Sequence, residues 1–292
     1  MDTCIACKKS AFETLIASKD YCVSREDFTV TKCTNCGFAF TANAPDAQHI
    51  GKYYEQADYI SHTDTKEGLF FKVYHKVRTY MLGQKLAYIK AHNLIKSLLD
   101  IGSGTGYFVN HVKHLKIEVL GFEPDAAARA QAKKNFDLDL ESSLEEVRQS
   151  KKTFDAISMW HVLEHVHELD VYFEHFRSLL NDKGLLVIAV PNYTSYDASF
   201  YKKYWAAYDL PKHLWHFSPQ SVKLLAANHQ FKHVQSYAMP FDPFYIALLS
   251  EGHKKSGIFG KIRALCVGGI SFFKGLVSSE KASSIVYIFS KN

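Results

Sequence analysis

Four cysteines near the N-terminus have the type and spacing of metal ligands. Residues 8–32 separate two Cys-x-x-Cys pairs, whose members are Cys4, Cys7, Cys33 and Cys36. Two such pairs can complete a tetrahedral zinc site, and four protein thiolates leave no position open for a substrate. We therefore expect a structural zinc, the alternative being four thiols without a metal. The intervening Cys22 is expected to be a core residue.

A glycine-rich turn follows an apolar run in the middle of the chain. Residues 98–106 read Leu-Leu-Asp-Ile-Gly-Ser-Gly-Thr-Gly, and a helix is expected to begin near Tyr107. The glycines let the backbone approach a ligand where any side chain would collide. Glu123, expected at the end of the next strand, could accept hydrogen bonds from ribose hydroxyls. A dinucleotide-binding loop would need a glycine where Tyr107 stands, and this disfavours NAD.

The segment from Asp100 to Gly106 resembles the first motif of the class I methyltransferases that depend on S-adenosylmethionine (SAM). Residues 154–166 and 179–192 are similar to the fourth-strand motif of that family and to the helix, turn and strand that follow it. The resemblance covers roughly residues 95–240. It is specific for the fold and the cofactor but not for the methyl acceptor.

The resemblance also implies cofactor contacts. The glycines would shape the methionine and ribose pocket, Asp100 would face the methionine amino group, directly or through water, and Glu123 would hold the ribose. The residues implied to bind the cofactor are Asp100, Gly102, Ser103, Gly104, Gly106, Glu123, Ser143, Trp160 and His161. Tyr53, Tyr59 and His62 could cover the cofactor, although helical aromatic residues more often belong to a core.

Two histidines are candidates for proton transfer near neutral pH, where histidine suits this role. His161 is expected where the fourth strand ends, and His165 falls one helical turn later. His213 lies in an Asp-x-Pro-x-His-Leu segment, and similar segments occur in small-molecule methyltransferases that resemble this chain. We take His213 as the first candidate base and His161 as the second; each could instead pack or cap a helix. His216 is expected to be structural.

Apolar runs alternate with helical patterns from residue 98 onward. Strands are expected at 98–101, 117–122, 138–140, 154–159, 185–190, 231–237 and 284–289. Apolar residues at steps of three and four from Leu169 to Leu180 predict a helix, which Gly184 would end in the left-handed conformation. This alternation predicts a Rossmann-like, doubly wound α/β fold with a mostly parallel, seven-stranded sheet and a small N-terminal zinc ribbon.

The same patterns predict the domain organisation. We expect a zinc ribbon at 1–40, a helical linker or cap at 41–96, and the methyltransferase domain at 97–292 with a helical insert at about 241–281. Within this insert, residues 252–279 contain five basic residues, no acidic residue and many large apolar ones. Such a segment can contact an anionic membrane or form a lid with a solvated basic face, and we favour the lid.

Composition leaves several partners open. The 292 residues have a net charge of +5, which permits a nucleic-acid or anionic-membrane partner without requiring one. The N-terminus has no signal-peptide pattern, and no apolar run is long enough to span a bilayer. We therefore expect a cytoplasmic protein.

Three functions fit these observations. The first is an enzyme that transfers a methyl group from SAM to O, N or C of a small-molecule or lipid-linked acceptor. The second is methylation of rRNA or tRNA bases, because some ribosomal RNA guanine methyltransferases carry a zinc ribbon before this domain. Acidic residues among the ribbon lysines argue against a phosphate-binding face there. The third is a non-catalytic SAM-binding interaction module.

Overall fold

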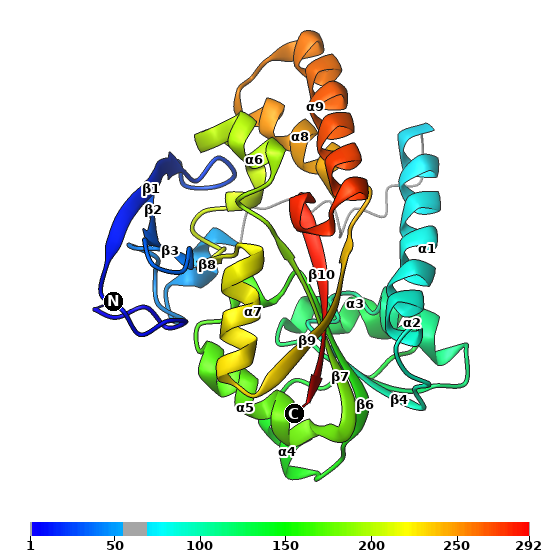
Figure 1. The fold of residues 1–292 in the computed structure, drawn as a ribbon. Coiled ribbons are helices and arrows are strands. Elements are labelled where there is room, and N and C mark those ends of the chain that lie inside the picture. The colour runs from blue at the N-terminus through cyan, green and yellow to red at the C-terminus, as the bar shows by residue number, and fades with distance from the viewer. Residues whose placement is uncertain (1, 55–68, 292) are drawn as a thin grey trace. The chain divides into compact units, whose positions relative to one another are not determined.

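The computed structural model of the protein describes residues 2–54 and 69–291, and for residues 69–74 only the backbone (Figure 1). Tyr59 and His62 lie outside the described residues. The chain divides into two compact units. The first unit comprises Met1–Ala57, Leu163–Leu169 and Ala189–Tyr287, and the second comprises Asp58–Val162, Asp170–Ile188 and Ile288–Asn292. The predicted division into ribbon, cap and methyltransferase domain stays a prediction.

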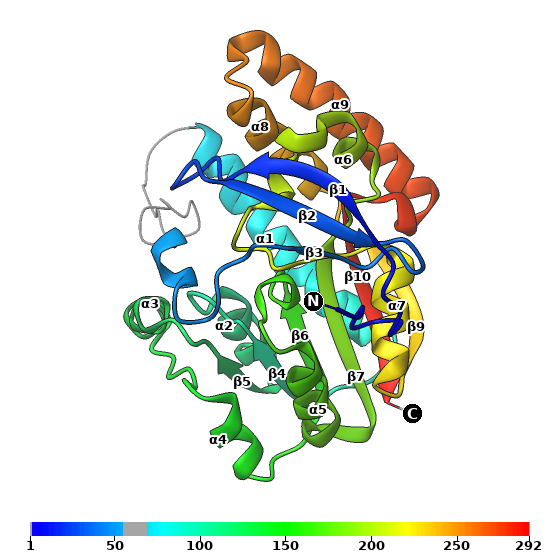
Figure 2. The same cartoon turned by 90° about the vertical axis from the view of Figure 1, so that its left-hand side faces the viewer.

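The first unit contains a small antiparallel sheet with the order β1-β2-β3-β8. Its strands are β1 (Phe12–Lys19), β2 (Asp27–Cys33), β3 (Ala39–Thr41) and β8 (Trp215–His216). Figure 2 shows β1 and β2 side by side, as their register from Phe12↔Cys33 to Lys19↔Asp27 requires. Asp20 shapes the turn between them, since its carboxylate accepts hydrogen bonds from the backbone N–H groups of the next turn residues.

The first unit also contains helices of different lengths and the strand β9. These elements are η1 (Ile50–Tyr53), η2 (Leu163–His165), α6 (Tyr196–Tyr201), η3 (Lys202–Tyr204), η4 (Ala206–Tyr208), α7 (Pro219–Asn228), β9 (Phe231–Ala238), α8 (Asp242–His253), α9 (Gly257–Val277) and η5 (Ser279–Lys281). Ser218 caps α7 through a reciprocal bond with Ser221, and Pro219 occupies the first turn. The insert expected at 241–281 consists mainly of the two helices α8 and α9.

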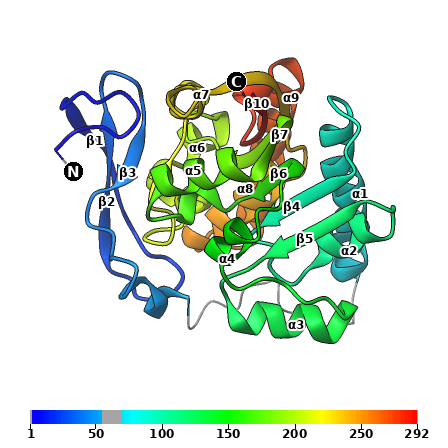
Figure 3. The ribbon, with the colours of Figure 1, turned by 90° about the horizontal axis from the view of Figure 1, so that it is seen from below.

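The second unit contains the parallel strands that follow one another in the sequence. Its strands are β4 (Ser97–Ile101), β5 (Glu118–Phe122), β6 (Phe154–Trp160) and most of β7 (Leu180–Pro191). Its helices are α1 (Leu69–Lys90), α2 (Tyr107–Lys113), α3 (Ala126–Phe136), α4 (Leu144–Gln149) and most of α5 (Leu169–Leu179). β4 pairs in parallel with β5 and with β6 (Figure 3). The predicted apolar face of α5 is buried at Leu169, Phe173 and Phe176.

The larger sheet has the strand order β5-β4-β6-β7-β10-β9, where β10 is Ser284–Lys291. The end of β7 meets the start of β10 through the Asn192 N–H to Ser283 O bond, and the end of β9 meets it through Met239 N–H to Ser284 O. β10 is therefore antiparallel to both neighbours, and the sheet is mixed. The predicted α/β Rossmann-like class is confirmed.

Two details of the sheet differ from the prediction. It has six strands among the described residues, because the strand expected at 138–140 is reduced to one bridge between Phe122 and Glu141. The acidic residues around this segment make a poor strand, and only two backbone bonds join it to β5. Gly184 does not adopt a left-handed conformation; it lies inside β7, which begins directly after α5.

Candidate functional site

The glycine-rich turn after β4 has a backbone that side chains would not tolerate. Gly102, Gly104 and Gly106 have φ angles of 72°, 53° and 81°, in the left-handed region. A Cβ added to Gly102 would lie 2.3 Å from Cγ2 of Val162. The N–H groups of Gly102 and Ser103 both donate to the carbonyl of Phe122, at 2.8 and 3.0 Å. The turn is thus fixed against the end of β5 before α2 begins.

Glu123 is bonded to this turn, as the spacing predicted it to be close. Its Oε2 accepts a 2.8 Å hydrogen bond from the N–H of Gly104, and its Oε1 accepts a 2.9 Å bond from the N–H of Asp125. The side chain is buried. Because each carboxylate oxygen has two lone pairs, both oxygens can accept a further bond from a ligand.

Asp100 is a buried carboxylate at the end of β4. The Ser158 hydroxyl donates to its Oδ1 at 2.7 Å, and Asp100 and Ser158 are paired in the β4–β6 register. Burial raises the pKa of Asp100 to about 6, although the Ser158 hydrogen bond and the charge of Lys85 act in the opposite direction. A cationic ligand group beside this carboxylate would lower its pKa again. Sequence reasoning missed Ser158, whose only signal is a polar residue within an apolar strand.

The end of β6 provides two further predicted residues. Trp160 is buried, contacts the ring of Phe108 edge-to-face at 5.6 Å, and has Lys85 Nζ 4.7 Å from its ring centroid. His161 has a φ of 60°, which is uncommon for a residue with a side chain and is typical of functional loops.

Ser143, in contrast, is the N-cap of α4. Its Oγ accepts a 3.2 Å hydrogen bond from the N–H of Glu146, which leaves the hydroxyl proton and one lone pair for a ligand. The cofactor role expected of Ser143 stays a prediction.

The four predicted metal ligands lie together in the first unit. The Sγ atoms of Cys4 and Cys36 are 3.6 Å apart, those of Cys7 and Cys33 are 3.5 Å apart, and all four lie within 4.8 Å of one another. Thiolates bound tetrahedrally to zinc are separated by roughly 3.8 Å, given Zn–S bonds of about 2.3 Å. The expectation that Cys22 belongs to the core was wrong, because Cys22 is exposed in the turn between β1 and β2.

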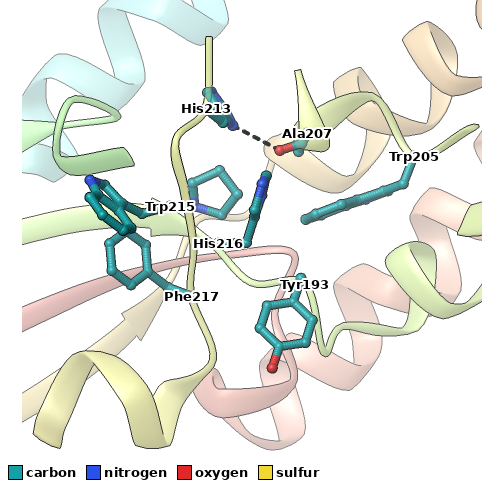
Figure 4. Close-up of a pocket in the computed structure, with 8 residues that line it drawn as sticks. Tyr193, Trp205, Ala207, His213, Trp215, His216 and Phe217 are labelled. Atoms are coloured by element: carbon teal, nitrogen blue, oxygen red, sulfur yellow. Dashed lines mark hydrogen bonds between the residues drawn. The ribbon is translucent and has the colours of Figure 1, made fainter. Parts of the chain in front are cut away.

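The predicted base His213 is buried in the first unit, beside two residues of η2. Its Nδ1 lies 2.9 Å from the carbonyl oxygen of Ala207 (Figure 4), and its ring is 4.6 Å from that of His165. One ligand atom each from Glu164, His165 and His213 lie within 4.8 Å of one another. Burial moves the pKa of His213 well below its ordinary value, and the neighbouring His165 lowers it further. Sequence reasoning missed Glu164, although it directly precedes His165.

His216 also lines the small pocket drawn in Figure 4. Its Nε2 lies 3.0 Å from the Thr41 hydroxyl, which donates to the carbonyl of His213 at 2.7 Å. Burial lowers the pKa of His216 to about 3. His216 is therefore neutral near pH 7 and joins β8 to β3, as expected of a structural residue.

The comparisons with known proteins show the family of the chain. The family model described as a methyltransferase domain matches residues 74–236, more than half of the chain, and the chain belongs to this family. The ubiquinone biosynthesis O-methyltransferase of Pelagibacter ubique is 32% identical over 102 residues, which are 33% of this chain and 42% of that protein. The human mitochondrial ubiquinone biosynthesis O-methyltransferase is 29% identical over 163 residues, 50% of this chain and 44% of that protein. The chain thus spans less than half the length of these two relatives.

A solved structure shows the same fold. The SAM-dependent methyltransferase from Thermotoga maritima, described as a possible histamine N-methyltransferase, matches with a TM-score of 0.50 and 18% identity. The match covers 76% of this chain and 95% of the other chain.

Proposed function

We propose that this protein transfers a methyl group from SAM to a small-molecule or lipid-linked acceptor. The bond between the Gly104 N–H and Glu123 supports this proposal most directly, because it joins the glycine-rich turn to the acid at the next strand end. The named activity of the curated relatives, O-methylation in ubiquinone biosynthesis, is consistent with an acceptor of this class.

The cofactor contacts follow from the same residues. Glu123 would hold the ribose hydroxyls, and the glycine turn with Ser103 would accept the backbone of the methionine moiety. Asp100 would hold the methionine ammonium group. Trp160 and His161 would flank the cofactor from the end of β6.

The chemistry is a displacement in which SAM supplies the activated methyl group. The acceptor atom forms the new bond to carbon, the carbon–sulfur bond breaks, and the acceptor proton passes to a base or to water. His213 and His161 remain the candidate bases.

We also propose a structural zinc at the four cysteines, on the ligand type and the sulfur separations given above.

The second hypothesis, in which the N-terminal ribbon docks RNA, is not favoured. Lys32 pairs with Glu13 at 2.8 Å, and Lys19 lies 3.5 Å from Asp27, so these cations are already balanced. The six cysteines form no disulfide in the structure, which suits the reducing cytoplasm that we propose as the location.

The acceptor class can be tested with SAM that carries a labelled methyl group. The purified protein is incubated with fractionated cell extract, with and without ribonuclease, and the pools are separated. We expect label in a ribonuclease-resistant lipid or small-molecule pool. Label that disappears with ribonuclease would indicate an RNA methyltransferase instead. An absence of label in every pool would favour the non-catalytic module.

Helix α9 provides a surface that suits a lipid-linked acceptor. Its small residues, such as Gly268 and Ala264, are buried, and a Cβ on Gly268 would lie 2.9 Å from the Phe244 ring of α8. Many of its large apolar residues are exposed instead, namely Ile258, Phe259, Ile262, Leu265, Ile270, Phe273, Leu276 and Val277, whereas Val267 is buried. We propose that this stripe, which we call the α9 apolar stripe, contacts an anionic membrane.

The charges near the α9 apolar stripe support this membrane contact. Lys254, Lys255 and Lys261 lie at the start of α9 or just before it, with no acidic residue in 252–279. Arg263 does not contribute, because it forms a bidentate pair with Glu251. Apolar side chains flanked by lysines are typical of helices that lie in the membrane interface. No helix among the described residues is long and apolar enough to cross a membrane.

Replacing Phe259 and Phe273 together with Gln is expected to weaken binding to phosphatidylglycerol-containing vesicles by at least roughly tenfold, because each phenylalanine contributes about 1.5–3 kcal/mol when buried in apolar surroundings. Vesicle co-sedimentation measures this. Leu94→Gln, which changes an exposed residue away from α9, is the matched control. If the wild-type protein does not bind these vesicles, α9 is better explained as the lid.

A further inference from the structure

A second cluster of metal-ligating side chains lies in the first unit, apart from the cysteines. It consists of Glu164 and His165 in η2 and His213 in the segment before β8. The ligand atoms of the three residues lie within 4.8 Å of one another. Glu164 is fully buried, and His213 is nearly so. Two imidazoles and one carboxylate form a ligand set that suits divalent transition metals and leaves coordination positions open.

The hydrogen bonds of the two histidines orient their rings for ligation. Nδ1 of His213 lies 2.9 Å from the carbonyl of Ala207. A carbonyl oxygen can only accept, so Nδ1 of His213 carries the hydrogen and its Nε2 keeps its lone pair. Nδ1 of His165 lies 3.1 Å from the carbonyl of Lys212 and 3.1 Å from the hydroxyl of Tyr54, and a bond donated to the carbonyl would leave the lone pair of its Nε2 for a metal in the same way. Metal-ligating histidines almost always donate their other N–H to a carbonyl or carboxylate in this way.

The ligand atoms of the three residues are also close enough together to share one ion. Bonds of about 2.0–2.2 Å to one ion would bring the ligand atoms roughly 3–4 Å apart. The present separations therefore need only a small contraction.

We propose that Glu164, His165 and His213 form a binding site for a divalent cation such as Mn²⁺. Three protein ligands leave coordination positions for water. A ligating Nε2 cannot take up a proton, so a bound cation would exclude His213 as the base of the proposed methyl transfer. That consequence rests on the proposed function, whereas the site itself does not. His161 would then be the remaining candidate base.

The test is a Mn²⁺ titration of the full-length protein with the ribbon zinc in place, in which electron paramagnetic resonance measures free Mn²⁺. Mn²⁺ prefers oxygen and nitrogen ligands and does not compete for thiolates. We expect one Mn²⁺ per chain, and an affinity at least roughly tenfold lower in Glu164→Gln and His213→Gln. His49→Gln, which changes an exposed histidine outside the cluster, should bind like the wild type.

A wild type that binds neither Mn²⁺ nor Co²⁺ beyond the ribbon metal would overturn the site, as would unchanged affinity in both variants. If these variants do not fold, nuclear magnetic resonance of the wild-type protein tests the site instead. Mn²⁺ bound there must broaden the imidazole ring signals of His165 and His213 before those of other histidines. The titration contains no SAM and no acceptor. Its failure therefore leaves methyl transfer untouched, while intact Mn²⁺ binding without methyl transfer would count only against the proposed function.

Discussion

Replacing Cys36 with Ser is expected to remove zinc from the N-terminal cluster and to lower the melting temperature of the protein. Cys36 is buried, and its Sγ is 3.6 Å from that of Cys4. Structural zinc sites contribute about 10–16 kcal/mol of apparent binding free energy to folding. Losing one ligand should therefore cost roughly 3 kcal/mol or more, which corresponds to about 6–12 °C.

Metal analysis and thermal unfolding measure the two effects of Cys36→Ser. Cys22→Ser is the matched control, because Cys22 is exposed and lies outside the four-sulfur cluster. The control should keep one zinc per chain and an unchanged melting temperature. Full zinc content in Cys36→Ser would mean that the four cysteines do not form the zinc site.

Replacing Glu123 with Ala is expected to weaken SAM binding by roughly 100-fold or more. Hydrogen bonds to a charged group contribute about 1.5–3 kcal/mol each, and the ribose would lose two of them. The variant also loses the bond that holds Gly104, so the glycine turn would be less well ordered for the methionine moiety. Isothermal titration calorimetry with SAM measures the affinity directly.

Glu118→Ala is the control for Glu123→Ala. Glu118 begins the same strand at its other end, and its side chain forms a 3.8 Å ion pair with Lys152, both side chains being exposed. Such pairs contribute at most about 1 kcal/mol, so this variant should bind SAM normally. If Glu123→Ala binds SAM as tightly as Glu118→Ala does, the ribose is held elsewhere.

The contact between the glycine turn and Glu123 could be predicted because these residues are close in sequence and fixed by one regular pairing. Parallel pairing of β4 with β5 brings Ile101 opposite Phe122, so the turn after one strand must meet the acid after the other. The cysteine pairs were predictable for a similar reason, since each is held within one tight turn. In both cases, local spacing determines the geometry.

The cluster of Glu164, His165 and His213 depends on contacts between distant segments, which spacing alone does not reveal. Glu164 and His213 come together only through the packing of η2 against the segment before β8, for example through the bond from Leu214 N–H to the carbonyl of Glu164. The missing seventh strand has a different cause. Acidic residues interrupt and flank its two leucines, Leu138 and Leu140, and the pairing with β5 stops after a single bridge.

The pairing of β3 with β8 has a consequence for synthesis on the ribosome. Phe40 and Ala39 pair with Trp215 and His216, so the N-terminal sheet is completed by residues translated much later. Until then, the edge of β3 exposes unpaired backbone N–H and C=O groups, to which a strand of another chain can pair. Early zinc binding at the cysteine cluster would give this segment an ordered form during that interval. The nascent chain would thus depend on metal supply well before its catalytic fold exists.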